Sequence, residues 1–131
     1  MKNYILMTMF IVALMACSTT KTKTESAMPV GALGDEYKQS KEATKSKYSG
    51  KTLTVKGWVG SAPIMPKGPS ETGYLSLAQK GGDMMFILSC QFNDADKAAF
   101  AKITADQIVT VTGTFEDDMS VALKSCKVVT D

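Results

Sequence analysis

Arginine and histidine are absent from this chain of 131 residues, and all 15 of its basic residues are lysines. Arginine supplies the planar fork that binds phosphates and guanine edges through paired hydrogen bonds, and histidine is the commonest metal ligand and general base. With 13 acidic residues, the formal charge is only +2. These features count against a groove that follows a nucleic-acid backbone, a histidine-based active site and a histidine metal site.

The chain also lacks an apolar run long enough to span a membrane. Its apolar segment from Ile5 to Ala16 would cover about 18 Å as a helix, against a hydrocarbon core roughly 30 Å thick. The segment follows the short basic start Met1-Lys2-Asn3-Tyr4 and ends in small residues. This build is typical of a secretory signal peptide.

The end of this segment, Leu14-Met15-Ala16-Cys17, resembles the lipobox of bacterial lipoproteins, with leucine three residues before the lipid-bearing cysteine and alanine directly before it. The resemblance implies that residues 1–16 are removed and that Cys17 is lipidated, which anchors the protein to a membrane of the cell envelope. Ser18 after the cysteine implies the outer membrane, facing the periplasm, if the host has two membranes. The alternative is an ordinary signal peptide cut near Ala16, with an incidental cysteine.

The stretch after Cys17 has few residues to bury. Residues 18–34 read STTKTKTESAMPVGALG, so we interpret residues 17–34 as the lipidated cysteine and a flexible tether. Residues 35–131 are enough for one small domain.

Within residues 35–131 the apolar pattern changes period. Residues 35–50 contain good helix formers, with acidic residues first and lysines last, and predict a surface helix held by Tyr37 and Tyr48. After it, a period of two predicts five strands, with a short helix over residues 93–103 between the third and fourth. The predicted strands cover residues 51–60, 74–78, 84–92, 108–115 and 120–129.

This order of elements is the topology of the five-stranded OB barrel. The predicted fold class is therefore mainly β, an OB-fold barrel with a helix between strands three and four and an added N-terminal helix. In detail, SKYSGKTLTVKGWV, CQF, IVTVTGTF and VALKSCKVV resemble the tRNA-anti-like family of OB proteins. Many members of that family are small secreted or lipid-anchored bacterial proteins. The resemblance implies the fold, and the family name is no evidence of contact with tRNA. One departure is Thr104-Ala105-Asp106, where the family often has a Gly-Asp turn.

Cys90 and Cys126 fall on the third and fifth predicted strands, which are neighbours in an OB barrel. An oxidising envelope favours a disulfide between them. Cys90 shares an inward face with Phe86, but Cys126 is out of phase with Leu123, so an inward Cys126 needs a bulge near Lys124-Ser125. The alternative is two buried thiols that act as small apolar residues. A redox role is not indicated, because no Cys-x-x-Cys arrangement is present.

We recognise no motif for catalysis, a cofactor or a metal. The chain has no Gly-x-Ser-x-Gly nucleophile motif and, without histidine, lacks the usual base. Glu116-Asp117-Asp118 lacks the spaced oxygen ligands of a calcium loop and fits a charged hairpin turn. Lys80-Gly81-Gly82-Asp83 joins two strands and fits a β-turn rather than a phosphate loop. We therefore expect a protein that is not an enzyme and has no cofactor or metal.

Ligand binding is the function that the pattern favours. Trp58, the only tryptophan, shares the outward face of the first strand with Lys56, and Tyr74 on the second strand extends that surface. Lys56, Trp58 and Tyr74 are thus the candidate binding residues, and Met85, Ile87 and Gln91 extend the same surface. The hypothesis is a lipid-anchored OB binding module for an oligosaccharide, peptide or oligonucleotide.

Two alternatives stay open. In the first, the helix of residues 35–48 covers Trp58 in full or in part, and with partial cover the ring edge reaches the loop of residues 61–73. In the second, the protein is an envelope adaptor or structural lipoprotein without a small ligand, and the same proline-rich loop contacts a partner protein. Nucleic acid is not expected as a partner, because the net charge is near zero and arginine is absent.

Overall fold

The computed structural model describes residues 26–82 and 86–130. Cys17, the predicted signal peptide and Met85 lie outside the described residues. In the described ranges, no helix has the length and apolar character needed to cross a membrane. The elements in chain order are β1 (Met28–Pro29), α1 (Val30–Gln39), α2 (Lys41–Tyr48), β2 (Thr52–Val59), β3 (Gly73–Ala78), β4 (Leu88–Phe92), the 3₁₀ turn η1 (Asp94–Asp96), α3 (Lys97–Phe100), β5 (Ile108–Asp117) and β6 (Val121–Val128).

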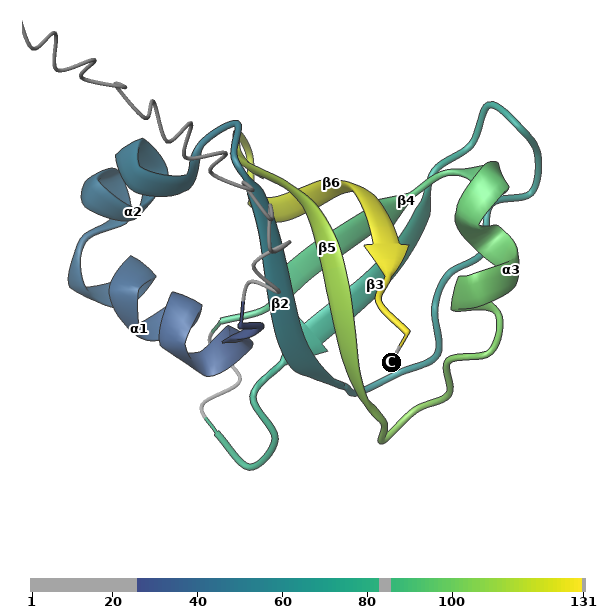
Figure 1. Cartoon of the computed structure of the whole chain (residues 1–131), viewed down its shortest axis with the longest axis horizontal. Coiled ribbons are helices and arrows are strands. Elements are labelled where there is room, and N and C mark those ends of the chain that lie inside the picture. Colours follow the sequence, from purple (N-terminus) through teal and green to yellow (C-terminus); the bar gives the residue numbers. More distant parts are fainter. Residues whose placement is uncertain (1–25, 83–85, 131) are drawn as a thin grey trace, which may run out of the picture.

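Strands β2 to β6 form a closed barrel (Figure 1). The sheet order is β1-β2-β3-β4-β6-β5, and an additional pairing of β2 with β5 closes the ring. β2 pairs with β5 along most of its length but meets β3 only at Trp58 and Val59. Helix α3 lies between β4 and β5, which are the third and fourth strands of the barrel. The predicted OB-fold class is confirmed.

Alternating side chains of the strands fill the barrel. In β2, Val55 and Val59 are fully buried while Lys56 between them is exposed, as the period of two predicts. Phe100 of α3 stacks on Phe92 of β4 with ring centroids 3.9 Å apart, so an aromatic pair fixes the helix on the barrel. The largest fully buried side chains are Phe92, Phe100, Phe115, Leu33, Leu75, Leu77, Leu88, Leu123, Val55, Val59, Val111 and Cys90.

The folded domain begins earlier than the sequence predicts, because residues 28–34 belong to the fold and not to a tether. β1 pairs in parallel with β2, and α1 starts at Val30. Val30 is 3% exposed and Leu33 is fully buried. The predicted boundary at residue 34 is therefore wrong. The two apolar residues stand three apart, so one face of a helix buries both in the barrel.

The helix predicted over residues 35–50 is divided at Ser40 into α1 and α2. Ser40 has an extended backbone, and its side-chain oxygen accepts a hydrogen bond of 3.2 Å from the Ala43 N–H, which caps α2. Tyr37 and Tyr48 hold the two helices on the barrel, as predicted. Their ring centroids lie 5.6 Å and 5.9 Å from those of two core phenylalanines.

Cys90 and Cys126 form a disulfide with Cα atoms 6.0 Å apart, and both residues are fully buried. The phase conflict on the last strand is resolved by a bulge at the predicted position. Ser125 adopts a φ of +52°, and the register of β5 against β6 shifts at the same place. As a result Leu123 and Cys126 are both buried. The expected disulfide is confirmed, and the alternative of two buried thiols is wrong.

Candidate functional site

Trp58 stands on the outer face of β2, as its place in the strand predicts. It is half-buried, and its neighbours in the sheet are Ala78 of β3 and Ile108 of β5. Ile108 is 58% exposed. An indole and an isoleucine side by side therefore form an apolar patch that is open to water.

A carboxylate holds the edge of the indole. The Trp58 Nε1–H donates a hydrogen bond of 2.8 Å to Asp106 Oδ1, and Lys80 Nζ lies 3.4 Å from the same oxygen. The hydrogen bond from Trp58, followed by the charge of Lys80, lowers the pKa of Asp106 because both favour the ionised carboxylate. Asp106 has a φ of +67°, a left-handed conformation that aspartate adopts more readily than most residues. The turn before β5 thus fixes the indole in one orientation.

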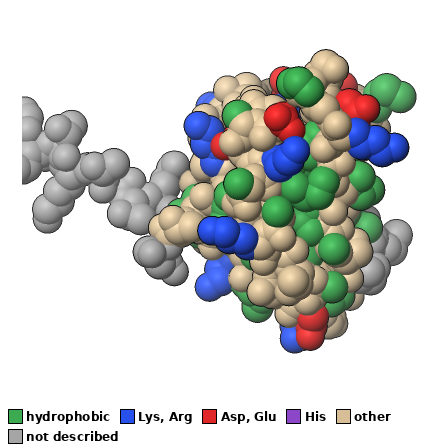
Figure 2. All heavy atoms as spheres, turned by 90° about the vertical axis from the view of Figure 1, so that its right-hand side faces the viewer, with side chains coloured by type: hydrophobic (Ala, Val, Ile, Leu, Met, Phe, Trp, Pro, Cys, Tyr) green, Lys and Arg blue, Asp and Glu red, His purple; other side chains and the backbone are tan. Residues whose placement is uncertain are grey.

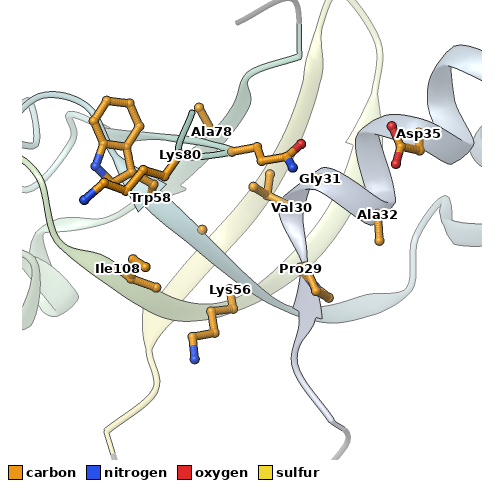
Figure 3. Close-up of a pocket in the computed structure, with 12 residues that line it drawn as sticks. Pro29, Val30, Gly31, Ala32, Asp35, Lys56, Trp58, Ala78, Lys80 and Ile108 are labelled. Atoms are coloured by element: carbon orange, nitrogen blue, oxygen red, sulfur yellow. The ribbon is translucent and has the colours of Figure 1, made fainter. Parts of the chain in front are cut away.

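A cleft of about 340 Å³ opens beside the indole (Figure 3). Its volume and its mostly apolar lining are typical of small-ligand sites. We call it the Trp58 cleft. It is lined by Pro29, Val30, Gly31, Ala32, Asp35, Lys56, Gly57, Trp58, Ala78, Gln79, Lys80 and Ile108.

The start of α1 forms the wall opposite Trp58 (Figure 3). A β-carbon on Gly57 would lie only 3.3 Å from Val30 Cγ1 and 3.0 Å from Leu77 Cβ, so the absence of a side chain lets α1 approach β2 closely. Of residues 35–48, only Asp35 reaches the lining of the cleft. Full cover of Trp58 by this helical segment is therefore wrong, because an open cleft lies between the segment and the indole.

Polar side chains surround the apolar floor. They are Lys56, Lys80, Gln79 and Asp35, with Lys56 and Asp35 on opposite sides of the cleft (Figure 3). Lys80 is paired with Asp106. Lys56 is exposed and has no ion-pair partner among residues 26–82 and 86–130. The rim therefore offers one uncompensated cation beside the indole.

A second hollow, of about 320 Å³, adjoins Trp58. The indole packs over Gly60, where a β-carbon would lie 3.2 Å from Trp58 Cζ3, and the hollow continues to Ser61. The ring thus packs over Gly60, directly before the loop of residues 61–73 with which the sequence predicts a contact. Trp58 and Ala78 border both hollows. The indole is consequently a ridge between two mostly apolar depressions.

Tyr74 is not part of this site. It is 42% exposed at the start of β3, where it pairs with Gln91 of β4 and with Ile64 of the preceding loop. Ala78, which borders the cleft, lies four residues further along the strand, roughly 13 Å away. The structure brings Lys56 and Trp58 together and leaves Tyr74 on a separate part of the surface.

The other residues of the predicted surface are divided in the same way. Ile87 borders the second hollow and is 48% exposed, whereas Gln91 lies in two smaller hollows beside Lys124. Sequence reasoning missed Asp106 and Ile108 as site residues. Both could have been found from their positions, next to or at the start of the fourth barrel strand. An OB barrel pairs that strand with the first strand, which carries Trp58.

The family model that matches this chain is tRNA_anti-like, over residues 3–127. The chain belongs to the tRNA_anti-like family. A solved lipoprotein from Klebsiella pneumoniae subsp. pneumoniae MGH 78578, to which nucleic acid binding is provisionally ascribed, has a TM-score of 0.67 at 16% identity, over 80% of this chain and 92% of that one. The hypothetical protein ygiW from E. coli has a TM-score of 0.41 at 11% identity, over 79% of this chain and 90% of its own. No curated protein matches significantly.

In this tRNA_anti-like domain, the neighbouring carboxylates Glu116 and Asp117 have separate partners. Glu116 pairs with Lys124 at 2.5 Å, and the buried Asp117 accepts a hydrogen bond of 3.4 Å from the Tyr37 hydroxyl. In the described part of the chain, no three His, Cys, Asp or Glu side chains gather closely enough to hold a metal ion.

Figure 2 shows lysines intermixed with acidic side chains on the face that carries α3. This face has no broad basic region among its described residues.

Proposed function

We propose that this protein is a non-catalytic binding module of the bacterial cell envelope that holds its ligand in the Trp58 cleft. The observation that carries the proposal is an open, mostly apolar cleft walled by an indole whose edge is held by Asp106. A ring already fixed in place loses little conformational freedom when a ligand packs against it. Water that leaves the apolar lining adds to the free energy of binding.

The polar groups of the cleft suit recognition better than catalysis. Catalysis at neutral pH needs a nucleophile or a base with a matched pKa, usually in a hydrogen-bonded pair. Lys80 and Asp106 are engaged with each other at the rim, and Asp106 is held in its ionised form. These groups position Trp58 and can orient a ligand by its charge.

Nucleic acid is not the ligand that this cleft favours. The similarity to the Klebsiella lipoprotein concerns the fold alone, at 16% identity. Lys80 is paired with Asp106 and Asp35 lines the side of the cleft opposite Lys56, so among the described residues Lys56 is the one lysine of the cleft left to meet a phosphate. Without an arginine in the chain, the lysines would bind phosphate only as point charges.

Photocrosslinking in intact cells tests the site. A photoreactive amino acid at Ile108, on the exposed edge of the cleft, should capture a ligand that mass spectrometry then identifies. The same amino acid at Tyr74, which is also exposed but lies outside the cleft, should not capture it. Capture from Tyr74 alone would move the site to the β3–β4 face. Capture from neither position would contradict a ligand site in the cleft.

The membrane anchor has a separate test. Because Cys17 is the proposed lipid acceptor, Cys17→Ala should leave unprocessed precursor, while the unchanged protein fractionates with membranes. Ser18→Ala is the matched control, since it alters the neighbouring residue and keeps the acceptor. A correctly trimmed, soluble Cys17→Ala product would refute lipid anchoring.

A further inference from the structure

Resting on the proposed site, we propose that the Trp58 cleft and the second hollow bind an extended peptide segment of a partner protein. The segment has two apolar side chains at positions i and i+2 and an acidic residue on the same face, at i−2 or i+4. Its apolar side chains enter the two hollows on either side of Trp58, and its carboxylate meets Lys56. This names the class of ligand, which the proposed function leaves open.

The paired hollows determine the spacing of the apolar groups. The first hollow contains Ile108 and Val30, the second contains Ile87, and both are bordered by Trp58 and Ala78. Two groups packed on opposite sides of one indole stand about 7 to 8 Å apart, at van der Waals contact with the ring. Side chains i and i+2 of an extended chain lie on one face about 6.6 Å apart. An extended peptide therefore matches the ridge with little rearrangement.

The charges at the rim determine the polar part of the segment. Lys56 lies two residues before Trp58 on the same outward face of β2, and no carboxylate among the described residues pairs with it. Lys80 already shares Asp106 with the indole. A carboxylate of the peptide beside Lys56 would complete an ion pair at the edge of an apolar contact. A basic residue of the peptide at the same place would be repelled by the positive charge of Lys56.

The lining favours a peptide over a glycan or a fatty acid. A sugar needs hydrogen-bonding groups along the surface on which its ring lies, whereas the polar side chains of the cleft stand at the rim and its floor consists of Trp58, Ile108, Ala78 and other apolar residues. A long acyl chain needs an enclosed cavity to bury most of its surface. Ile108 at 58% exposed and Ile87 at 48% exposed show that both hollows are open to water. Open hollows suit short side chains.

Titration of Trp58 emission tests the proposal, because the chain has one tryptophan. We use the full chain in phosphatidylcholine vesicles and the blocked peptide Ac-Glu-Ala-Leu-Ala-Leu-Ala-Glu-NH₂, in which the glutamates share one face of the extended chain with the leucines. Saturable change of the emission is expected. Replacing both leucines by serine should weaken binding more than about ten-fold, since two apolar contacts are lost. Replacing both glutamates by glutamine should weaken it roughly two- to five-fold, as for an exposed ion pair.

Two protein variants test whether Lys56 is the residue that recognises the glutamates of the peptide. Lys56→Met keeps the apolar stem of the side chain and removes its charge, so it should weaken the glutamate peptide by the same two- to five-fold. It should leave the glutamine peptide unchanged. Lys127→Met removes a charge from an exposed lysine on β6, outside both hollows, and should affect neither peptide.

The outcomes separate this proposal from the proposed function. Equal affinity for the leucine and serine peptides would overturn the proposal that the ligand is an apolar and acidic peptide. Equal affinity for the glutamate peptide and for one with lysines in place of both glutamates would overturn it too. A saturable response to decanoate, a cello-oligosaccharide or oligo-dT without one to any peptide would also overturn it, while the cleft would stand as a ligand site. If no probe changes the Trp58 emission and Ile108 captures no ligand in cells, the cleft is not a ligand site.

Discussion

At the scale of single residues, the orientation of Trp58 depends on Asp106. The two residues are 48 positions apart in the chain, and their hydrogen bond of 2.8 Å joins β2 to the turn before β5. Asp106 has a left-handed backbone, and its carboxylate accepts the hydrogen bond from the indole. Asparagine and glycine also adopt this conformation without difficulty, so the carboxylate can be changed while the turn is kept.

We predict that Asp106→Asn keeps the indole in place and that Asp106→Gly releases it. The asparagine side-chain oxygen still accepts from Nε1, whereas glycine offers no side chain. The fluorescence anisotropy of Trp58 should fall in Asp106→Gly and stay near the unchanged value in Asp106→Asn. Equal anisotropy in all three proteins would show that the hydrogen bond does not restrain the ring.

The same hydrogen bond predicts a dependence on pH. Because the fold lowers the pKa of Asp106, its contribution to stability is present above the pKa of the unfolded chain, at about 4. The contribution is lost as the pH falls through the lower pKa of the folded state. Trp58 emission should therefore change below about pH 4 in the unchanged protein. Asp106→Asn, which carries no titrating group at this position, should lack that step.

At the scale of elements, the segment formed by β1 and α1 packs on the closed barrel and forms one wall of the cleft. β2 meets β3 only at its end, and β1 pairs with the part of β2 that β3 leaves free. Val30 and Leu33 bury themselves against the barrel, and Pro29 and Val30 line the cleft. The element that stabilises the fold is therefore also a wall of the site.

A truncation series tests this double role. A chain that starts at Ser26 should be as stable as the full chain, whereas one that starts at Asp35 loses two buried side chains. The expected loss is about 3 to 6 kcal/mol, at about 1.5 to 3 kcal/mol for each buried aliphatic residue. Urea unfolding measures the difference, and Trp58 emission should shift to longer wavelength as the wall is removed. Equal urea midpoints for the two truncations would contradict the assignment.

The sequence predicted this element only in part. Alternation in β2 showed which residues face inward, and the parity conflict at Cys126 located the bulge at Ser125. Val30 and Leu33 escaped prediction because they stand among small residues and glycines, where a single pair of apolar residues does not define a helical stripe. Their burial depends on a free length of β2 that only the assembled barrel reveals.

At the scale of the whole molecule, a disulfide joins two neighbouring strands of the barrel. The disulfide connects β4 to β6, which pair in parallel, and closes a sequence separation of 36 residues. A loop of that length stabilises the folded chain by about 4 kcal/mol in the chain-entropy model. For a small domain this is a large share of the total stability.

We predict that Cys90→Ala with Cys126→Ala lowers the free energy of unfolding by about 4 kcal/mol. Urea denaturation of the oxidised protein and of the double variant measures the difference. Since both sulfurs are fully buried, a reductant should have little effect on the native protein until urea is added. A double variant with an unchanged urea midpoint would show that the link adds nothing to stability.

The candidate site, like the segment formed by β1 and α1, could be predicted from the sequence only in part. Strand parity placed Trp58 and Lys56 outside the barrel on one face. It also grouped Tyr74 with them, because parity assigns a face but not a position along the strand. The cleft itself depends on the register of β2 against β5, on Gly57 and on the start of α1. None of these is set by local pattern.

The central claim is that the Trp58 cleft is a ligand site, and nuclear magnetic resonance of the ¹⁵N-labelled protein tests it most directly. The single tryptophan gives a single indole N–H signal. Addition of a soluble extract of the host envelope should shift this signal and the backbone amide of Ile108 in a saturable way. The amides of Tyr74 and Gln91 should stay in place. Shifts confined to Tyr74 and Gln91, or no shift at Trp58 at any extract concentration, would contradict the account.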